Sequence, residues 1–240
     1  GGVMKGTTPR KEDDIPIFQT GLFNGKTTGA PLTILFENKN TRSGDYEKQR
    51  SVPRPGHADF VAHQKFGGYE DFRGGGHFSG RLTVGLVAAG VVAKKILSNL
   101  EIRAAILEIG GEKDLEAGLQ KAIDAKDSIG GIVECRVNGL PAGLGEPFFD
   151  SVESLIGHAV FAIPAVRGIE FGTGFAAARM FGVEHNDSIA DATGKTVTNH
   201  AGGVVGGISN GNELVFRIAI KPTSSTPREQ VTLNWETMQQ

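Results

Sequence analysis

A glycine-rich stretch between Arg54 and Leu97 carries side chains that could do chemistry. His57 follows a Pro-Gly pair, and three consecutive glycines precede a long apolar segment. Glycines directly ahead of a helix N-terminus form an anion site, because free backbone N–H groups and the positive end of the helix dipole converge there. The same stretch adds the polar side chains of Arg73, His77, Ser79 and Arg81. The pattern indicates an anion-binding loop, although a glycine-rich turn with solvated charges is the simpler explanation from these residues alone.

Two other segments have a composition that suits anionic ligands. Residues 38–54 contain an excess of lysine and arginine, which fits either an anionic ligand or a mobile surface loop. A strand predicted over residues 214–220 ends in Lys221-Pro222-Thr223-Ser224-Ser225, after a glycine-rich segment over 199–207. A lysine and three hydroxyls at a strand end suit a phosphate group. A polar turn is the alternative.

The bulk composition describes a globular chain. Its 240 residues, 39% of them apolar and 22% charged, are enough for one domain of ordinary size and not clearly enough for two. The net charge of −2 argues against a general nucleic-acid or membrane-surface binder. The single cysteine, Cys135, excludes an internal disulfide framework, and we expect a cytoplasmic protein.

Several common motifs fail to match. The glycines at 74 and 76 are followed by Ser79 where a dinucleotide fingerprint needs glycine, and neither Gly-Lys-Thr triplet has the first glycine of a P-loop. The histidines and the cysteine show no metal-ligand spacing, so we expect no metal. A nucleotide-dependent oxidoreductase is therefore supported only by the glycine-rich loops.

Periodicity predicts the elements that must position these residues. Residues 15–36 indicate an antiparallel hairpin around Asn24-Gly25. Residues 81–99 indicate a helix that is apolar nearly all round, capped by Ser79 or Gly80, so we expect a central helix buried on several sides.

Further along the chain, two helices and two strands are predicted. Asp114 is expected to cap one helix, and Asp150 with Glu153 resembles a capping box for a second helix over 151–163. Alternation over 133–137 points Cys135 at the core. Because strands are joined by hairpins or helices without regular alternation, α+β is the expected class.

Blocks in a fixed order along nearly the whole chain resemble the chorismate synthase family. They are Arg54-Pro-Gly-His-Ala-Asp59, Lys65-Phe-Gly, Asp71-x-Arg73-Gly-Gly-Gly76, Val87-Ala-Ala-Gly-Val-Val-Ala-Lys94, Asp127-Ser-Ile-Gly130, Pro141-Ala-Gly-Leu-Gly-Glu-Pro147, Ala165-Val-Arg-Gly-Ile-Glu-Phe-Gly172, Gly174-Phe175, Asn186-Asp187, Thr198-Asn-His-Ala-Gly-Gly203, Gly206-Gly-Ile-Ser-x-Gly211 and Lys221-Pro-Thr-Ser-Ser225.

The resemblance implies a lyase that removes phosphate and a proton from 5-enolpyruvylshikimate 3-phosphate by 1,4-anti elimination, giving chorismate in the shikimate pathway. It implies dependence on reduced FMN without net redox change, with the flavin donating an electron transiently and recovering it. It also implies a β-α-β sandwich with helices packed between antiparallel sheets, usually as a homotetramer. NADP and a separate flavin reductase are candidate partners for supplying the reduced flavin. Nucleic-acid and membrane partners are not expected.

The resemblance also implies roles for individual residues. His57 corresponds to the histidine thought to protonate reduced flavin, which suits an imidazole because it changes charge near neutral pH. The expected flavin contacts are Ser79, Pro164, Ala165, Gly206, Lys221, Pro222, Thr223, Ser224 and Ser225. Lys5 and Arg81 are the expected substrate contacts, with Lys5 in place of a family arginine, which keeps the charge but loses the bidentate fork.

Two departures from the family pattern qualify these expectations. The family's Arg-Ser-Ser-Ala-Arg-Glu-Thr is here His77-Phe-Ser-Gly-Arg-Leu-Thr83, which leaves the contacts of His77 and Phe78 open. The motif carrying a second catalytic histidine would precede Gly1, and the Arg-His-Asp motif would follow Gln240. We therefore expect a single domain over 1–240, truncated at both ends, and keep as an alternative a fragment that binds FMN or assembles without turnover.

Overall fold

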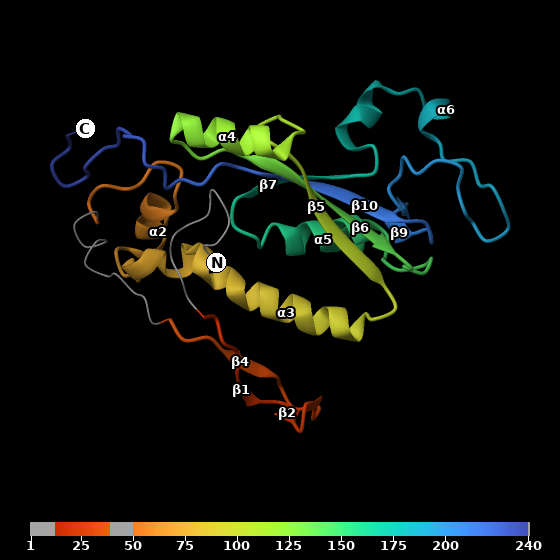
Figure 1. The fold of residues 1–240 in the computed structure, drawn as a ribbon, viewed down its shortest axis with the longest axis horizontal. Helices are drawn as coiled ribbons and strands as arrows, with labels where there is room; N and C mark the ends of the chain where they lie inside the picture. Colours follow the sequence, from red (N-terminus) through yellow and green to blue (C-terminus); the bar gives the residue numbers. More distant parts are fainter. Residues whose placement is uncertain (1–12, 39–49, 240) are drawn as a thin grey trace. The chain divides into compact units, whose positions relative to one another are not determined.

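The structure, a computed structural model, describes residues 13–38 and 50–239 (Figure 1). The chain divides into two compact units, which are treated separately below. Unit 1 extends to Val92 and resumes at Glu229, and unit 2 is Ala93–Arg228. Within the described residues, no helix is long and apolar enough to cross a membrane.

Unit 1 contains the predicted hairpin. Strand β1 (Ile17–Thr20) pairs antiparallel with β4 (Thr33–Leu35), and the short strands β2 (Leu22–Phe23) and β3 (Lys26–Thr27) pair across Asn24-Gly25. Both turn residues have positive φ, 48° and 73°, as a two-residue type I′ turn requires. The hairpin prediction is confirmed.

The remaining helices of unit 1 carry the histidine and glycine motifs. Helix α2 (Asp59–Phe66) ends at Gly67, whose left-handed backbone favours glycine. Two short 3₁₀ segments follow, η1 (Arg73–Phe78) and η2 (Gly80–Leu82). Helix α3 (Thr83–Ile96) then continues across the boundary into unit 2.

The expectation for the apolar helix was wrong in its burial and its bounds. The helix begins at Thr83 rather than Arg81, because Ser79 caps the preceding 3₁₀ turn. None of its residues is buried, and Val87 is 66% exposed. An apolar composition shows how much surface a helix could bury. The described residues cover only part of the surface of α3.

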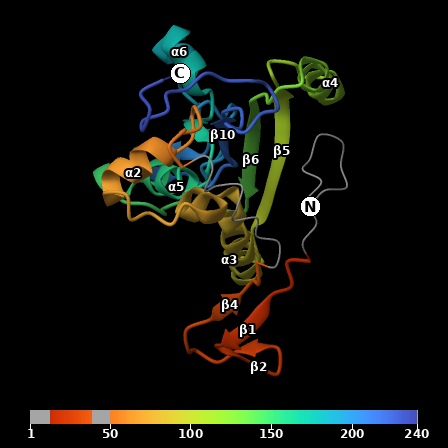
Figure 2. The same ribbon diagram turned by 90° about the vertical axis from the view of Figure 1, so that its left-hand side faces the viewer.

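Unit 2 is built on a four-stranded antiparallel sheet in the order β5-β6-β10-β7. Figure 2 shows β5, β6 and β10 of this sheet. The strands are β5 (Glu101–Ile109), β6 (Gly131–Asn138), β7 (Val166–Phe171) and β10 (Leu214–Ile220). Phe216 of β10 lies opposite Cys135 on one side and Phe171 on the other. The α+β class and the antiparallel pairing expected from the sequence are confirmed.

One face of this sheet forms the core of unit 2. Val137, Val152, Val204 and Leu214 make the buried cluster, and Cys135 packs against it. Val152 begins helix α5 (Val152–Val160), whose N-cap is Ser151, with its Oγ accepting from Ser154 N at 3.1 Å. The predicted capping box at Asp150 was therefore wrong, and so was the helix end at residue 163.

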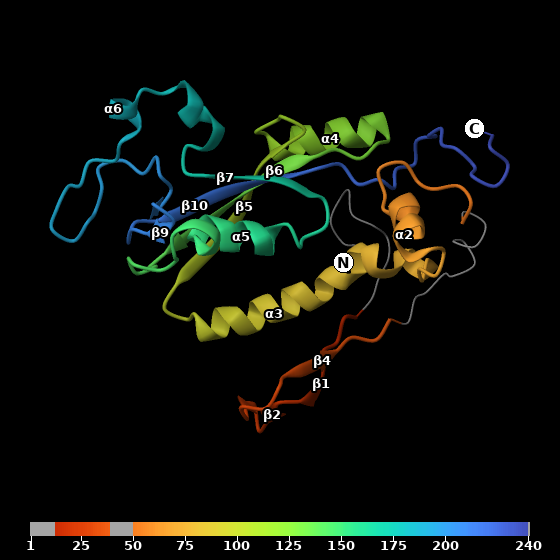
Figure 3. The ribbon, with the colours of Figure 1, turned by 180° about the vertical axis from the view of Figure 1, so that it is seen from behind.

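Helix α4 (Leu115–Ala125) packs against the edge strand β5, with the predicted Asp114 cap confirmed. The short elements of unit 2 are η3 (Phe148–Asp150), η4 (Gly174–Arg179), α6 (Gly182–His185), β8 (Val204–Val205) and β9 (Ile208–Ser209). The segment with α6 lies beyond the end of the sheet near β9, as Figures 1 and 3 both show.

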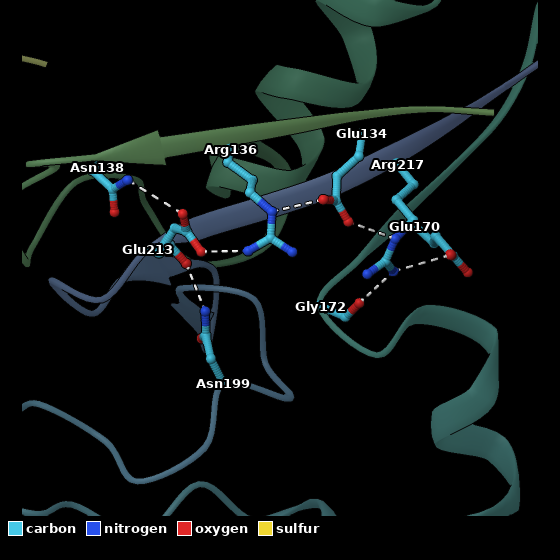
Figure 4. Close-up of polar contacts among 8 residues, drawn as sticks. All are labelled: Glu134, Arg136, Asn138, Glu170, Gly172, Asn199, Glu213 and Arg217. Atoms are coloured by element: carbon cyan, nitrogen blue, oxygen red, sulfur yellow. Dashed lines mark hydrogen bonds and ion pairs between the residues drawn. The ribbon is translucent and has the colours of Figure 1, made fainter. Parts of the chain in front are cut away.

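The other face of the sheet carries a charged network (Figure 4). Glu134, 8% exposed, accepts from Arg136 and Arg217 at 2.6 and 2.9 Å. Arg136 reaches Glu213, and Arg217 reaches Glu170. Two arginines therefore satisfy the buried carboxylate, as a buried charge requires.

Candidate active site

His57 lies in the turn before α2, where it contacts a carboxylate. Its Nδ1 is 2.5 Å from Oδ1 of Asp59, the first residue of α2. Arg54 donates from Nε and Nη2 to the two oxygens of the same carboxylate, each at 2.8 Å. A φ of 70° at Gly56 turns the backbone, so that Arg54, His57 and Asp59 meet within six residues of sequence.

The electrostatics of this cluster keep Asp59 ionised. Burial acts to raise the pKa of the Asp59 carboxyl, but the hydrogen bonds from Arg54 and His57 outweigh it and hold that pKa well below its usual range. An ionised carboxylate only accepts, so His57 Nδ1 carries the proton in this contact. The side chain of His57 is 18% exposed. Asp59 thus fixes which nitrogen of the ring is the donor.

A cavity of about 310 Å³ in unit 1 adjoins the partners of His57. Arg54 and Asp59 line it together with His77, Phe78 and Trp235. His77 and Phe78 are the positions whose contacts the sequence left open. The structure places both beside the cluster that orients His57.

Ser79 caps the 3₁₀ turn η2, which contains Arg81 and directly precedes α3. Ser79 Oγ accepts from Arg81 N at 3.2 Å, which makes Ser79 a cap as well as an expected flavin contact. The guanidinium of Arg81 donates to the carboxylate of Asp14 and to the carbonyl of Glu37. Substrate binding by Arg81 would therefore involve exchanging Asp14 for a ligand carboxylate or phosphate.

In unit 2, the loop after β10 brings together two of the expected contact segments. Lys221 N donates to Ala165 O at 2.9 Å, which joins the Pro164-Ala165 segment to the Lys221–Ser225 segment. Lys221 Nζ donates to Ser224 Oγ at 3.2 Å. Ala165 has φ of 72°, an unusual conformation for a residue with a Cβ, and such conformations cluster at functional sites.

This loop is held by residues that the sequence analysis did not single out individually. Ser128 Oγ donates to Thr223 O at 2.8 Å, and Asp127 accepts from Thr226 Oγ1 at 2.7 Å. The Asp127–Gly130 block was noted only as a family match. Asp127 and Ser128 stand directly before β6, the strand that pairs with β10. Two polar side chains at that position were the sequence signal for contacts with the loop after β10.

Gly206 occupies the tip of the β8–β9 hairpin. Its φ is 63°, and no heavy atom lies within 4 Å of where a Cβ would stand. The neighbouring Gly207 differs, because a Cβ there would lie 2.8 Å from Ser151 Cβ. The backbone at Gly206 is therefore accessible to a ligand.

The predicted site residues fall into two groups. Unit 1 holds His57, Ser79 and Arg81, whereas unit 2 holds Pro164, Ala165, Gly206 and the Lys221–Ser225 loop. Lys5 lies outside the described residues. Sequence reasoning missed the roles of Arg54 and Asp59, although the spacing Arg-x-x-His-x-Asp was visible.

Comparison with known proteins links both groups to one family. The family model described as chorismate synthase matches residues 1–240. A chorismate synthase of Chitinophaga pinensis is 73% identical over 96% of this chain and 70% of the relative, and one of Dehalococcoides mccartyi is 44% identical over 99% and 74%. A crystal structure of chorismate synthase superposes with a TM-score of 0.71 at 26% identity, covering 86% of this chain and 70% of that one.

Proposed function

The chain belongs to the chorismate synthase family of lyases, and we propose that it eliminates phosphate from 5-enolpyruvylshikimate 3-phosphate to give chorismate, with reduced FMN as cofactor. The observation that carries the proposal is the His57–Asp59 pair beside a cavity, in a chain whose second unit offers a phosphate-type loop. We also propose that residues 1–240 form one domain.

His57 is the proposed proton donor to reduced flavin. Asp59 accepts from Nδ1, which orients the ring. Proton donation would run through Nε2, which must then carry a second ring proton, and Arg54 Nη2, 3.3 Å from that nitrogen, would have to give way to the ligand. A group that transfers a proton needs its reacting atom held in place, because misalignment costs rate. The Asp59 contact provides that orientation.

The residues of unit 2 fit FMN chemically. Lys221 and Ser224 supply a cation and a hydroxyl suited to the flavin phosphate, and the open backbone at Gly206 admits a flat ring. Ser79, Pro164, Ala165, Pro222, Thr223 and Ser225 are proposed to complete the flavin contacts. Reduced FMN, when bound, supplies an electron transiently and recovers it, so the elimination has no net redox change.

The substrate carries a phosphate and two carboxylates, so its site needs cations. We assign Arg81 and Lys5 to it. A homotetramer in the cytoplasm, with reduced flavin supplied by NADP-linked chemistry or a separate reductase, completes the proposal. The alternative is a chain that binds FMN without turnover. The match covers 70% and 74% of the length of the two relatives above.

The test is an anaerobic assay with reduced FMN and 5-enolpyruvylshikimate 3-phosphate, following chorismate by absorbance. His57→Asn is expected to lower kcat about 100-fold or more, since a positioned acid contributes about 10²–10⁴-fold. The matched control is His158→Asn, because His158 is an exposed histidine on α5. Absence of chorismate with the unaltered chain, together with FMN binding, would favour the alternative, whereas equal rates for the two variants would refute the role of His57.

A further inference from the structure

One carboxylate in unit 2 holds the loop that leads to Gly206. Asp187 Oδ1 accepts from Thr198 Oγ1 at 2.7 Å and from His200 N at 2.8 Å, while Oδ2 accepts from Ala201 N at 2.9 Å. Because the acceptor is an ionised carboxylate, these three hydrogen bonds are charge-assisted, and such bonds are stronger than those between neutral groups. Asp187 thus anchors the Thr198–Ala201 segment from one side.

The polar face of the sheet anchors the same loop from the other side (Figure 4). Asn199 Nδ2 donates to Glu213 O at 2.8 Å, and Asn199 Oδ1 accepts from Gly203 N at 2.9 Å. Glu213 itself is fixed by Arg136 at 2.6 Å and Asn138 at 3.2 Å. The charged network of the sheet therefore extends through Glu213 to Asn199 in the loop.

The loop also crosses the Gly172–Thr173 segment at close range. Thr173 N donates to His200 O at 2.8 Å, and His200 Nδ1 lies 2.8 Å from Thr173 Oγ1. A Cβ on Gly172 would collide with His200 O, and one on Gly202 would lie 2.6 Å from Gly172 Cα. Two backbones that cross this closely fix each other's position.

The anchored segment runs directly into the β8–β9 hairpin. Asn210 N donates to Gly203 O at 3.0 Å, and Val152 N donates to Gly207 O at 2.9 Å. Both bonds tie the base and one side of the hairpin turn, and Gly206 remains exposed at the tip. A shift of the Thr198–Gly203 segment would therefore move Gly206.

We propose that Asp187 is a positioning residue that holds the Thr198–Gly207 loop in the shape that places the Gly206 backbone against bound flavin. The step from the loop to the flavin rests on the proposed function. Asp187 itself touches neither cofactor nor substrate in this proposal. Its carboxylate acts through Thr198, His200 and Ala201.

Asp187→Asn is the variant that tests this proposal, with Asp191→Asn as its matched control. The amide keeps the size of the side chain but turns one acceptor into a donor, which opposes a backbone N–H. Asp191 accepts from Thr193 N at 2.8 Å, and its carboxyl bonds lie within an exposed turn four residues further on. Both variants lose one carboxylate, and only the first affects the loop.

Two readouts are used, and neither requires turnover. FMN affinity, measured by quenching of flavin fluorescence, is expected to fall about tenfold or more in Asp187→Asn, because losing charge-assisted hydrogen bonds lets the loop leave the shape that binds flavin. Hydrogen exchange at residues 198–207 is expected to speed up in the same variant without FMN. Asp191→Asn is expected to match the unaltered protein in both readouts.

The outcomes separate the two proposals. Unchanged exchange and unchanged FMN affinity in Asp187→Asn would overturn the positioning role. Faster exchange in a protein whose unaltered form binds no FMN would retain the loop anchor, contradict the flavin step and overturn the proposed function. If Asp187→Asn fails to fold, Thr198→Val removes one of the three bonds, and it is expected to show a smaller loss of affinity; unchanged affinity there would overturn the proposal.

Discussion

At the scale of single residues, the cluster around His57 shows how a carboxylate can orient a histidine without itself reacting. Asp59 holds His57 Nδ1 at 2.5 Å and is itself held by Arg54. The low pKa of Asp59 means that its charge persists throughout the pH range in which an imidazole titrates. Asp59 therefore remains a charged acceptor for His57 Nδ1 near neutrality.

Asp59→Asn is expected to lower kcat at least about tenfold with little change in KM for the substrate, because an orienting carboxylate sets the tautomer of its histidine. Steady-state kinetics measure both parameters. Glu112→Gln is the control, since Glu112 also forms an ion pair, with Lys121 at 3.2 Å, and does not line the cavity. Equal kcat values in the two variants would contradict the orienting role.

The same pair of variants also gives a readout in acid. A carboxyl whose pKa is lower in the folded state stabilises the protein above its unfolded pKa of about 4, and that contribution is lost as pH falls through the folded value. Loss of the Asp59 carboxylate is therefore expected to flatten the decline in stability below about pH 4. A melting-temperature series against pH measures this slope.

Sequence reasoning reached His57 but not the residues that orient it. A histidine in a matched block carries a role from the family, whereas Arg54 and Asp59 show their role only once Gly56 turns the chain. The Asp187 anchor was further from reach, because its partners lie 11–14 residues away. The sequence shows where polar residues stand, but the hydrogen-bond partners of these residues depend on the tertiary structure.

At the scale of elements, two helical glycines in unit 2 differ in their surroundings. Gly118 of α4 is buried, and a Cβ there would collide with the Ile109 carbonyl of β5. Gly157 of α5 has no atom within 4 Å of its Cβ position. Gly118 therefore allows α4 to approach β5 closely. Gly157 has no such packing role, and a residue with higher helix propensity would fit there.

Gly118→Ala is expected to destabilise the protein by about 1–3 kcal/mol, because the added methyl must displace backbone. Gly157→Ala, the matched substitution in α5, is expected to stabilise by about 0.5–1 kcal/mol. Chemical denaturation measures both free energies of unfolding. The contact between α4 and β5 would be contradicted if the two variants changed stability in the same direction.

The elements also show where periodicity succeeds and fails. The β1–β4 hairpin and β10 were predicted because alternation and an Asn-Gly turn are local signals. The prediction that α3 is buried on several sides was wrong, because burial depends on neighbours from other parts of the chain. The cap of α5 shifted by one residue to Ser151, whose extended backbone suits an N-cap.

At the scale of the whole molecule, the question is whether the two units fold as one domain. The sequence predicted a single domain over 1–240, and this stays a prediction. The chain passes between the units twice, at Val92–Ala93 and at Arg228–Glu229. The first passage lies inside α3, which continues without a break from Thr83 to Ile96.

The chain contains one natural probe for each unit. Trp235, the single tryptophan, stacks on His63 in unit 1 with ring centroids 4.8 Å apart. Cys135, the single cysteine, packs against the core of unit 2, where burial raises the pKa of its thiol. Tryptophan fluorescence therefore reports on unit 1, and the labelling rate of the thiol reports on unit 2.

We expect the two probes to give the same midpoint in a guanidinium titration, because a helix shared by both units cannot stay folded in one and unfold in the other without losing its interior hydrogen bonds. His63→Leu serves as the control, since it removes the ring stacked on Trp235 and is expected to change the fluorescence amplitude while the two midpoints still coincide. Midpoints that differ beyond error would show that each unit unfolds by itself. The continuous α3 would then be a connection between two domains.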